Sequence, residues 1–213
     1  MLGRVFSRFN LPVKPVVRSP LRDEIRRQLV DGLISGRWAP GERIVERRIA
    51  TDLGVSQAPV REALRELEAL RLIESSPNKG ARVRPFTRDD LREVYQVRAG
   101  LEETAARLGA PSVEVLESCT ARLGDAAADG ALADQVSAGI AFHREIVAAS
   151  GNALLLSVWE GLGLEVWTHL SIRLFRAELH ENAADHRPLL DAFRTRSPEA
   201  PAMLRAHILS YAP

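Results

Sequence analysis

The stretch from 46 to 70 constrains the fold more than any other part of this chain, because apolar residues recur at helical spacing on both sides of one glycine. These positions are Ile49, Ala50 and Leu53 before the glycine, and Val60, Leu64, Leu67 and Leu70 after it. Gly54 lies between the two runs and suits the left-handed conformation that ends a helix. The pattern predicts two short helices joined by a tight turn.

The second of these helices leaves a surface of polar and small side chains opposite its apolar side: Gln57, Ala58, Arg61 and Arg65. Ser56 is expected to cap the helix by accepting a backbone N–H, and Pro59 is tolerated in its first turn. A helix–turn–helix whose second helix exposes such a surface is the arrangement that enters the DNA major groove.

The flanking segments complete a winged helix-turn-helix. A first helix is predicted from the spacing of Leu21, Ile25, Leu29, Leu33 and Ile34, and Gly36 ends it. After the pair of helices, 72–74 and 81–84 alternate as strands around the turn Pro77–Gly80, which indicates a hairpin with a basic tip.

From Thr87 onward the strand pattern stops and the sequence predicts a series of helices, over 88–108, 112–127, 132–149, 153–179, 183–196 and 199–210. Thr87 is a good N-cap for the first of them, whose inward stripe is predicted to be Val94, Val97, Leu101, Ala105 and Leu108. The fold class is therefore mainly α: an N-terminal winged helix-turn-helix followed by an all-α antiparallel helical bundle. The expected division is a flexible basic arm over 1–19, a DNA-binding domain over 20–86 and an effector-binding and dimerisation domain over 87–213.

Charge separates the two halves of the chain. Residues 1–86 hold 17 Lys and Arg against 10 Asp and Glu, whereas residues 87–213 hold 12 against 18. The basic half contains the predicted DNA-binding motif, as phosphate attraction requires. The basic arm either adds non-specific DNA affinity or is a passive tail.

The sequence also bears on the setting of the protein. A single cysteine, Cys119, permits no intramolecular disulfide, and we expect a reducing cytoplasm. No apolar run is long enough for a signal peptide or a membrane span, so no membrane partner is expected.

Several motifs resemble the GntR family of bacterial transcription regulators. They are Gly36–Ile44, Ile49-Ala50, Leu53–Ser56, Pro59–Leu64, Leu67-Glu68 and Asn78–Ala81. Further along, Val97–Glu102, Phe142-His143, Ser150–Asn152, His186 and His207 are similar to the ligand-binding domain of its FadR subfamily, called FCD. The resemblance implies a homodimeric transcription regulator, expected to be a repressor, that reads an inverted-repeat DNA operator and is released or rearranged by a small organic-acid effector.

The resemblance assigns DNA contacts to Arg47, Ser56, Gln57, Ala58, Arg61 and Gly80. Arginines can bind phosphate or guanine, the serine hydroxyl can donate to phosphate, and a glycine lets the wing backbone enter the minor groove. The alternative for Arg47 and Arg61 is a solvated ion pair with Glu46, Glu66 or Glu68. Gln57 stands where the family commonly has arginine; glutamine suits adenine, unless it only contacts a phosphate.

The resemblance also implies a metal site, at Gly139, His143, His186 and His207. Gly139 replaces the family's aspartate, and Asp134 lies on the opposite helix face from His143. Three imidazoles can still hold Zn²⁺ or Ni²⁺ with reduced affinity, the alternative being that the metal is lost and the histidines remain as remnants or hydrogen-bond donors. His169 and His180 match no motif.

Arg98 and Arg173 are the candidate effector-binding residues, because a guanidinium pairs bidentately with a carboxylate. Only Arg98 matches a family position, and either arginine can instead belong to a surface ion pair. Two other functions stay open: a regulator without small-molecule input, and a metal-dependent hydrolase. The chain is not expected to be an enzyme, since no nearby carboxylate stands out as a general base.

Overall fold

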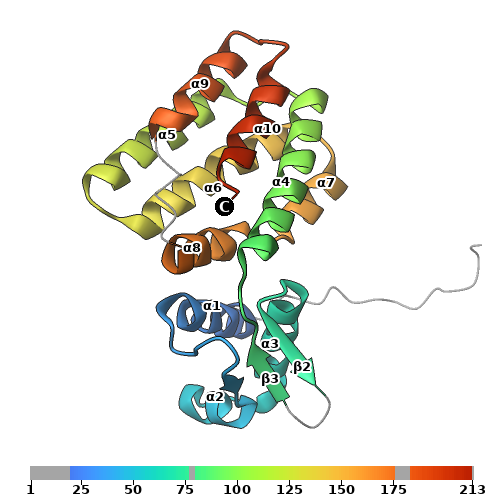
Figure 1. The fold of residues 1–213 in the computed structure, drawn as a ribbon, viewed down its shortest axis with the longest axis vertical. Coiled ribbons are helices and arrows are strands. Elements are labelled where there is room, and N and C mark those ends of the chain that lie inside the picture. Colours follow the sequence, from blue (N-terminus) through green and yellow to red (C-terminus); the bar gives the residue numbers. More distant parts are fainter. Residues whose placement is uncertain (1–19, 77–79, 176–182, 213) are drawn as a thin grey trace, which may run out of the picture.

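The computed structural model describes residues 20–76, 80–175 and 183–212, arranged as a small winged unit beneath a larger helical unit (Figure 1). The expected arm over 1–19 and the wing turn at 77–79 lie outside the described residues. Among the described residues, no helix is long and apolar enough to cross a membrane.

The winged unit contains the three predicted helices: α1 (Pro20–Ser35), α2 (Glu46–Leu53) and α3 (Gln57–Ala69). Gly54 ends α2 in the left-handed conformation, with φ 65° and ψ 30°, as predicted. The apolar runs of the three helices share one core, in which Ile25, Val60 and Leu67 are almost completely buried.

The predicted wing is present but is one strand larger than expected. β2 (Ile73–Ser76) pairs antiparallel with β3 (Gly80–Val83), and β1 (Arg43–Ile44) adds to the other side of β3. The two-residue strand β1 was not predicted, because a run so short leaves no alternation to detect. It places Arg43 opposite Arg82 on the wing.

In its described residues, 87–175 and 183–212, the upper unit contains seven helices: α4 (Arg88–Leu108), α5 (Val113–Ala128), α6 (Leu132–Ala149), α7 (Ala153–Glu160), α8 (Leu164–Phe175), α9 (Ala183–Arg194) and α10 (Ala200–Ser210). The prediction of one helix over 153–179 was wrong. The chain turns at Gly161–Gly163, where Gly163 has φ 63°, so the segment forms α7 and α8.

The predicted inward stripe of α4 was right for Ala105, which is buried, and for Val94 and Leu101, which pack against the core, but wrong for Val97 and Leu108. Val97 and Leu108 are 49% and 56% exposed, whereas the buried residues of α4 include Arg98 and Glu102. The true inward face is rotated by about one residue and carries two charged groups into the bundle. Helix α4 begins as predicted, because Thr87 and Asp90 form a capping box.

The winged and helical units share a hydrophobic core, and α8 lies directly above α1 (Figure 1). Phe86, in the connecting segment, packs edge-on against Trp167 of α8 with ring centroids 5.7 Å apart. The turn between α7 and α8 contacts the end of α3, since a Cβ built on Gly163 would lie 2.8 Å from a methyl carbon of Leu70. The orientation of one unit therefore depends on the packing of the other.

Candidate DNA interface and buried histidine site

A groove of about 470 Å³ opens between α2, α3 and the wing. Its charged lining is mainly basic, with Arg43, Arg47, Arg61 and Arg65 against Glu46 and Glu68, and the neutral Gln57 lines it as well. Gln57, Ala58 and Arg61 are exposed, so the surface predicted to meet DNA points to solvent.

Arg61 is held by an ion pair across this groove. Its Nε and a terminal nitrogen donate to the two carboxylate oxygens of Glu46 at 3.2 and 2.7 Å. The solvated pairing considered from the sequence is therefore present for Arg61, although its side chain is still 54% exposed. Arg47 is exposed, and no ion pair to it is found among the described residues. Glu66, another carboxylate considered as a partner of Arg47 from the sequence, pairs instead with Arg22 and Arg26.

Ser56 occupies the N-cap position of α3, but the predicted cap hydrogen bond was wrong. Its backbone has the extended conformation of an N-cap, while no side-chain hydrogen bond caps the helix. An exposed hydroxyl at the start of a recognition helix is placed to donate to a phosphate.

Arg43 is a groove residue that the sequence analysis missed. Next to the turn at the tip of the wing, Gly80 has φ 75°, and a Cβ built on it would lie 3.2 Å from Nε of Arg43. Arg43 therefore passes close to the residue predicted to enter the minor groove. The signal that could have found it is the basic residue directly before the buried Ile44, which indicates one exposed position on an edge strand.

The three histidines predicted to bind metal do come together inside the helical unit. His143 on α6 and His186 on α9 are fully buried, His207 on α10 is partly exposed, and one ligand atom from each lies within 4.8 Å of the others. The Nε2 atoms of His143 and His186 are 3.3 Å apart. Asp134 is exposed at the start of α6, away from this cluster, as predicted.

Glu102 on α4 lies behind the histidine cluster and was given no role in the sequence analysis. Its Oε2 is 2.5 Å from Nδ1 of His143, while its Oε1 accepts from Nε of Arg98 and from Nε1 of Trp159, both at 2.8 Å. Burial alone would raise the pKa of the Glu102 carboxyl. The nearby charges of His143 and Arg98, and the hydrogen bonds that these two residues form with the carboxylate, outweigh burial and lower that pKa to about 2. A buried, ionised carboxylate therefore joins α4, α6 and α7.

The spacing of His143 and His186 fits a divalent metal ion, and the ligand atoms of all three histidines lie within 4.8 Å of one another. One ion with Zn–N bonds of about 2.0–2.1 Å and tetrahedral angles holds two imidazole nitrogens about 3.3–3.4 Å apart, which matches the spacing of His143 and His186. The donor set of three imidazoles suits Zn²⁺ or Ni²⁺. Gly139, one turn before His143 on α6, supplies no side-chain ligand.

Arg98 is buried beside this cluster, 1% exposed, and pairs with Glu102. The alternative considered from the sequence, an ion pair on the surface, was right about the pairing but wrong about its location, since the Arg98–Glu102 pair is buried. Arg173 belongs to α8, and its side chain lies outside the described residues.

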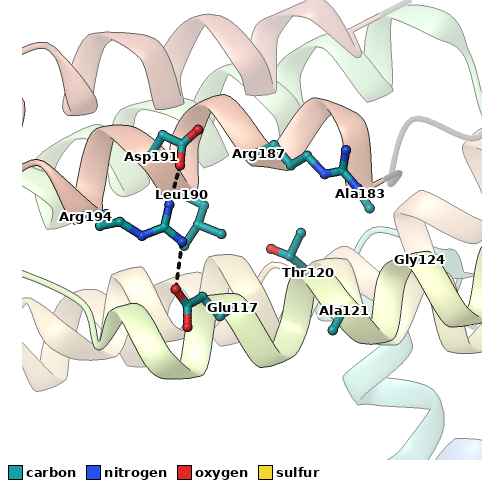
Figure 2. A pocket seen from close by; sticks show the side chains of 9 residues that line it. All are labelled: Glu117, Thr120, Ala121, Gly124, Ala183, Arg187, Leu190, Asp191 and Arg194. Carbon is teal, nitrogen blue, oxygen red and sulfur yellow. Dashed lines mark hydrogen bonds and ion pairs between the residues drawn. The ribbon is translucent and has the colours of Figure 1, made fainter.

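A second groove of about 470 Å³ lies on the outer side of the bundle, between α5 and α9 (Figure 2). Arg194 extends across it to Glu117 at 2.7 Å and also pairs with Asp191 on its own helix. Two carboxylates already neutralise this arginine. The groove is thus a weak candidate for an organic acid.

The fold and its basic groove define a class of protein, a DNA-binding regulator with a winged helix-turn-helix joined to an all-helical domain. Two family models match the chain: bacterial regulatory proteins of the gntR family over residues 21–83, and the FCD domain over residues 93–210. The chain therefore belongs to the GntR family and carries an FCD domain. It is a regulator and not an enzyme, and the hydrolase alternative is excluded on this ground.

Similar proteins agree with this assignment. The "Probable D-xylose utilization operon transcriptional repressor" of Paenarthrobacter nicotinovorans is 37% identical over 205 residues, covering 94% of this chain and 91% of the relative. The gluconate operon transcriptional repressor of Bacillus licheniformis is 29% identical, covering 79% and 69%. The crystal structure of a GntR regulator from Rhodococcus sp. RHA1 has the same fold, with a TM-score of 0.72, 21% identity and coverage of 90% and 95%.

Proposed function

We propose that this protein is a homodimeric transcriptional repressor that binds an inverted-repeat operator and is released by a small organic acid. The observation that carries the proposal is the exposed face of α3 beside a basic groove, in a chain of the GntR family. Residues 20–86 would bind DNA, with Arg47, Ser56, Gln57, Ala58, Arg61 and Gly80 as contacts, and residues 87–213 would bind the effector and dimerise. Repression as the output is supported by the names of the two relatives above.

The DNA part of the proposal is tested by selecting binding sites from randomised duplexes and measuring affinity for the selected sequence by fluorescence anisotropy. We expect Arg61→Ala to weaken binding by about 1–3 kcal/mol. Arg92→Ala, which removes an exposed arginine on α4 paired with Asp89, is the control and should bind like the parent chain. Equal affinity of all three proteins would contradict the assignment of α3 as the recognition helix.

An apolar surface on α4 and α7 supports the homodimer. Val97 and Leu108 on α4, and Leu154 and Val158 on α7, are between 45% and 74% exposed, and the two helices lie side by side (Figure 1). A second copy of the chain, related by a two-fold axis, would cover this surface with the same residues. Two recognition helices would then face the half-sites of an inverted repeat.

Analytical ultracentrifugation tests the dimer. Leu154→Glu should shift the equilibrium toward monomer, because a charge would then be buried in the interface. Val115→Glu, at a 41% exposed valine on α5, is the matched control and should leave the mass unchanged. A Leu154→Glu variant that dimerises normally would place the interface elsewhere.

In the helical domain, His143, His186 and His207 would hold Zn²⁺ or Ni²⁺, with Arg98 and Arg173 pairing with the effector carboxylate. The spacing of the imidazole nitrogens supports the metal, and the buried guanidinium of Arg98 supports an acidic effector. A thermal-shift screen of organic acids, with and without divalent metals, tests both, because any ligand of the folded state raises the melting temperature. No shift with any combination would favour a regulator without small-molecule input.

A further inference from the structure

We propose that Glu102 is the positioning residue of the histidine site: its carboxylate accepts the Nδ1 proton of His143 and thereby reserves the Nε2 lone pair of that ring for a divalent metal ion. This inference rests on the metal site proposed above. It concerns how α4, an element that supplies no ligand, prepares one ligand for binding.

The contacts of Glu102 fix the direction of its hydrogen bond with His143. Each carboxylate oxygen only accepts when the group is ionised. Oε1 receives two N–H donors, from Arg98 and Trp159, and Oε2 lies 2.5 Å from Nδ1 of His143. Nδ1 must therefore be the protonated nitrogen. In the neutral imidazole Nε2 is then unprotonated, and it is Nε2 that lies 3.3 Å from the ring of His186.

The surroundings make the carboxylate hard to replace. Glu102 and His143 are both fully buried, so no water competes for these hydrogen bonds at the side chains themselves. A glutamine has one acceptor oxygen and one NH₂ group. If the glutamine oxygen faces the two donors Arg98 and Trp159, its NH₂ group faces His143. In the reverse orientation, the NH₂ group faces the two donors and has no acceptor there. The first orientation satisfies more groups, and it forces His143 to accept at Nδ1 and to carry its proton on Nε2.

Carboxylates that orient a metal-binding histidine in this way have a measurable effect on affinity, typically 10–100-fold. Because Gly139 supplies no anionic ligand, Glu102 is the buried carboxylate in hydrogen-bond contact with the cluster among the residues described. The hydrogen bond to His143 is the contact through which it would act on the metal.

The test compares the full-length parent chain with Glu102→Gln, using Glu103→Gln as the matched control. Glu103 is the next residue on α4, but it faces outward and pairs with Arg107 and Arg205. Ring ¹⁵N NMR of the metal-free proteins reports which nitrogen of His143 is protonated. Titration with Zn²⁺, and with Co²⁺ as a coloured probe, reports affinity and the ligand field.

We expect a proton on Nδ1 of His143 in the parent chain and in Glu103→Gln, and on Nε2 in Glu102→Gln, with metal affinity reduced 10–100-fold in that variant alone. An unchanged tautomer together with unchanged affinity would overturn the proposal. If the parent chain binds neither metal, the proposed metal site fails, while the tautomer comparison still decides the role of Glu102.

A second variant protects the test against misfolding, because Glu102→Gln leaves the buried charge of Arg98 without its carboxylate. Replacing both members of a buried ion pair by apolar residues is often tolerated. In Arg98→Met/Glu102→Met, His143 loses its acceptor, and we expect a mixture of tautomers and weaker metal binding. A single Nδ1-protonated species with parental affinity in this variant would overturn the proposal.

Discussion

At the scale of single residues, the proposed DNA surface depends on charges that are partly balanced before DNA arrives. Arg61 is bound by both oxygens of Glu46, and Glu68 lines the same groove. If Arg61 contacts DNA as proposed, phosphate would have to compete with a carboxylate for its guanidinium. The ion pair would then restrain the guanidinium and lower the affinity for any duplex, whatever its sequence.

Replacing Glu46 by glutamine should strengthen binding to random duplex DNA several-fold at low ionic strength, because one negative charge leaves the groove and Arg61 is freed for phosphate. Fluorescence anisotropy over a range of salt concentrations measures the affinity. Glu62→Gln is the control, since it makes the same charge change on α3 at an exposed residue outside the groove. Equal gains in both variants would mean that the Arg61–Glu46 pair has no part in the effect.

Gln57 is exposed at the start of α3, where its amide is available to a base edge. Glutamine matches the donor and acceptor of adenine, whereas arginine matches the two acceptors of guanine. We expect Gln57→Arg to move the preferred base at one position of each half-site toward guanine. Binding-site selection with both proteins measures this, and identical selected sequences would indicate that Gln57 contacts only phosphate.

At the scale of elements, the sequence predicted best where an apolar period and a stop signal coincide. The ends of α1 and α2, and the start of α4 at Thr87, agree with the structure for this reason. Prediction failed where a helix turns within an apolar run, at Gly161–Gly163. It failed at two positions of α4, because the exposed Val97 and Leu108 mimic a core-facing stripe while Arg98 and Glu102 are buried. Periodicity shows which residues share a face of a helix. It does not show that a charged pair four residues apart, such as Arg98 and Glu102, is buried in the helical bundle.

The capping box of α4 has a pH-dependent contribution to stability. Burial would raise the pKa of Asp90, but hydrogen bonds from Thr87 and the charge of Arg84 lower it below the ordinary value of 3.8. A carboxyl whose pKa is lower in the folded state stabilises it above the unfolded pKa, and this stabilisation is lost as the pH falls through the folded pKa.

Asp90→Asn should therefore reduce the free energy of unfolding by about 1 kcal/mol at neutral pH, and the difference should shrink once the pH falls below about 4. Urea unfolding at several pH values measures it. Asp89→Asn, at a carboxylate that is 82% exposed, should change little. A deficit of Asp90→Asn that stays constant down to low pH would exclude the ionised cap as its origin.

At the scale of the whole molecule, a short series of residue contacts connects the proposed ligand site with the proposed recognition helix α3. Glu102 binds Trp159 of α7, α7 ends in the turn at Gly161–Gly163, and that turn contacts Leu70 directly after α3. This contiguity offers a route by which metal or effector binding changes the placement of α3.

Gly163→Ala tests this route, with Gly151→Ala as its matched control. Both glycines have positive φ, 63° and 68°, so each alanine costs about 1–2 kcal/mol of backbone strain. A new Cβ at Gly163 displaces Leu70, whereas nothing lies within 4 Å at Gly151. We expect only Gly163→Ala to alter the effect of Zn²⁺ on DNA affinity. The same metal response in the two variants would count against the route.

The core that Phe86, Trp167 and Leu70 help to form also limits how the protein can be rebuilt. A chimera that ends at Phe86 and continues with an unrelated sensor would lose Trp167 together with α8, and would leave Phe86 and Leu70 facing water. Such a hybrid would tend to aggregate unless α8 and the glycine turn before it were transplanted as well. For biosensor engineering, the unit to exchange is thus the winged domain together with α8. The boundary between the two family matches is a poor point at which to join two proteins.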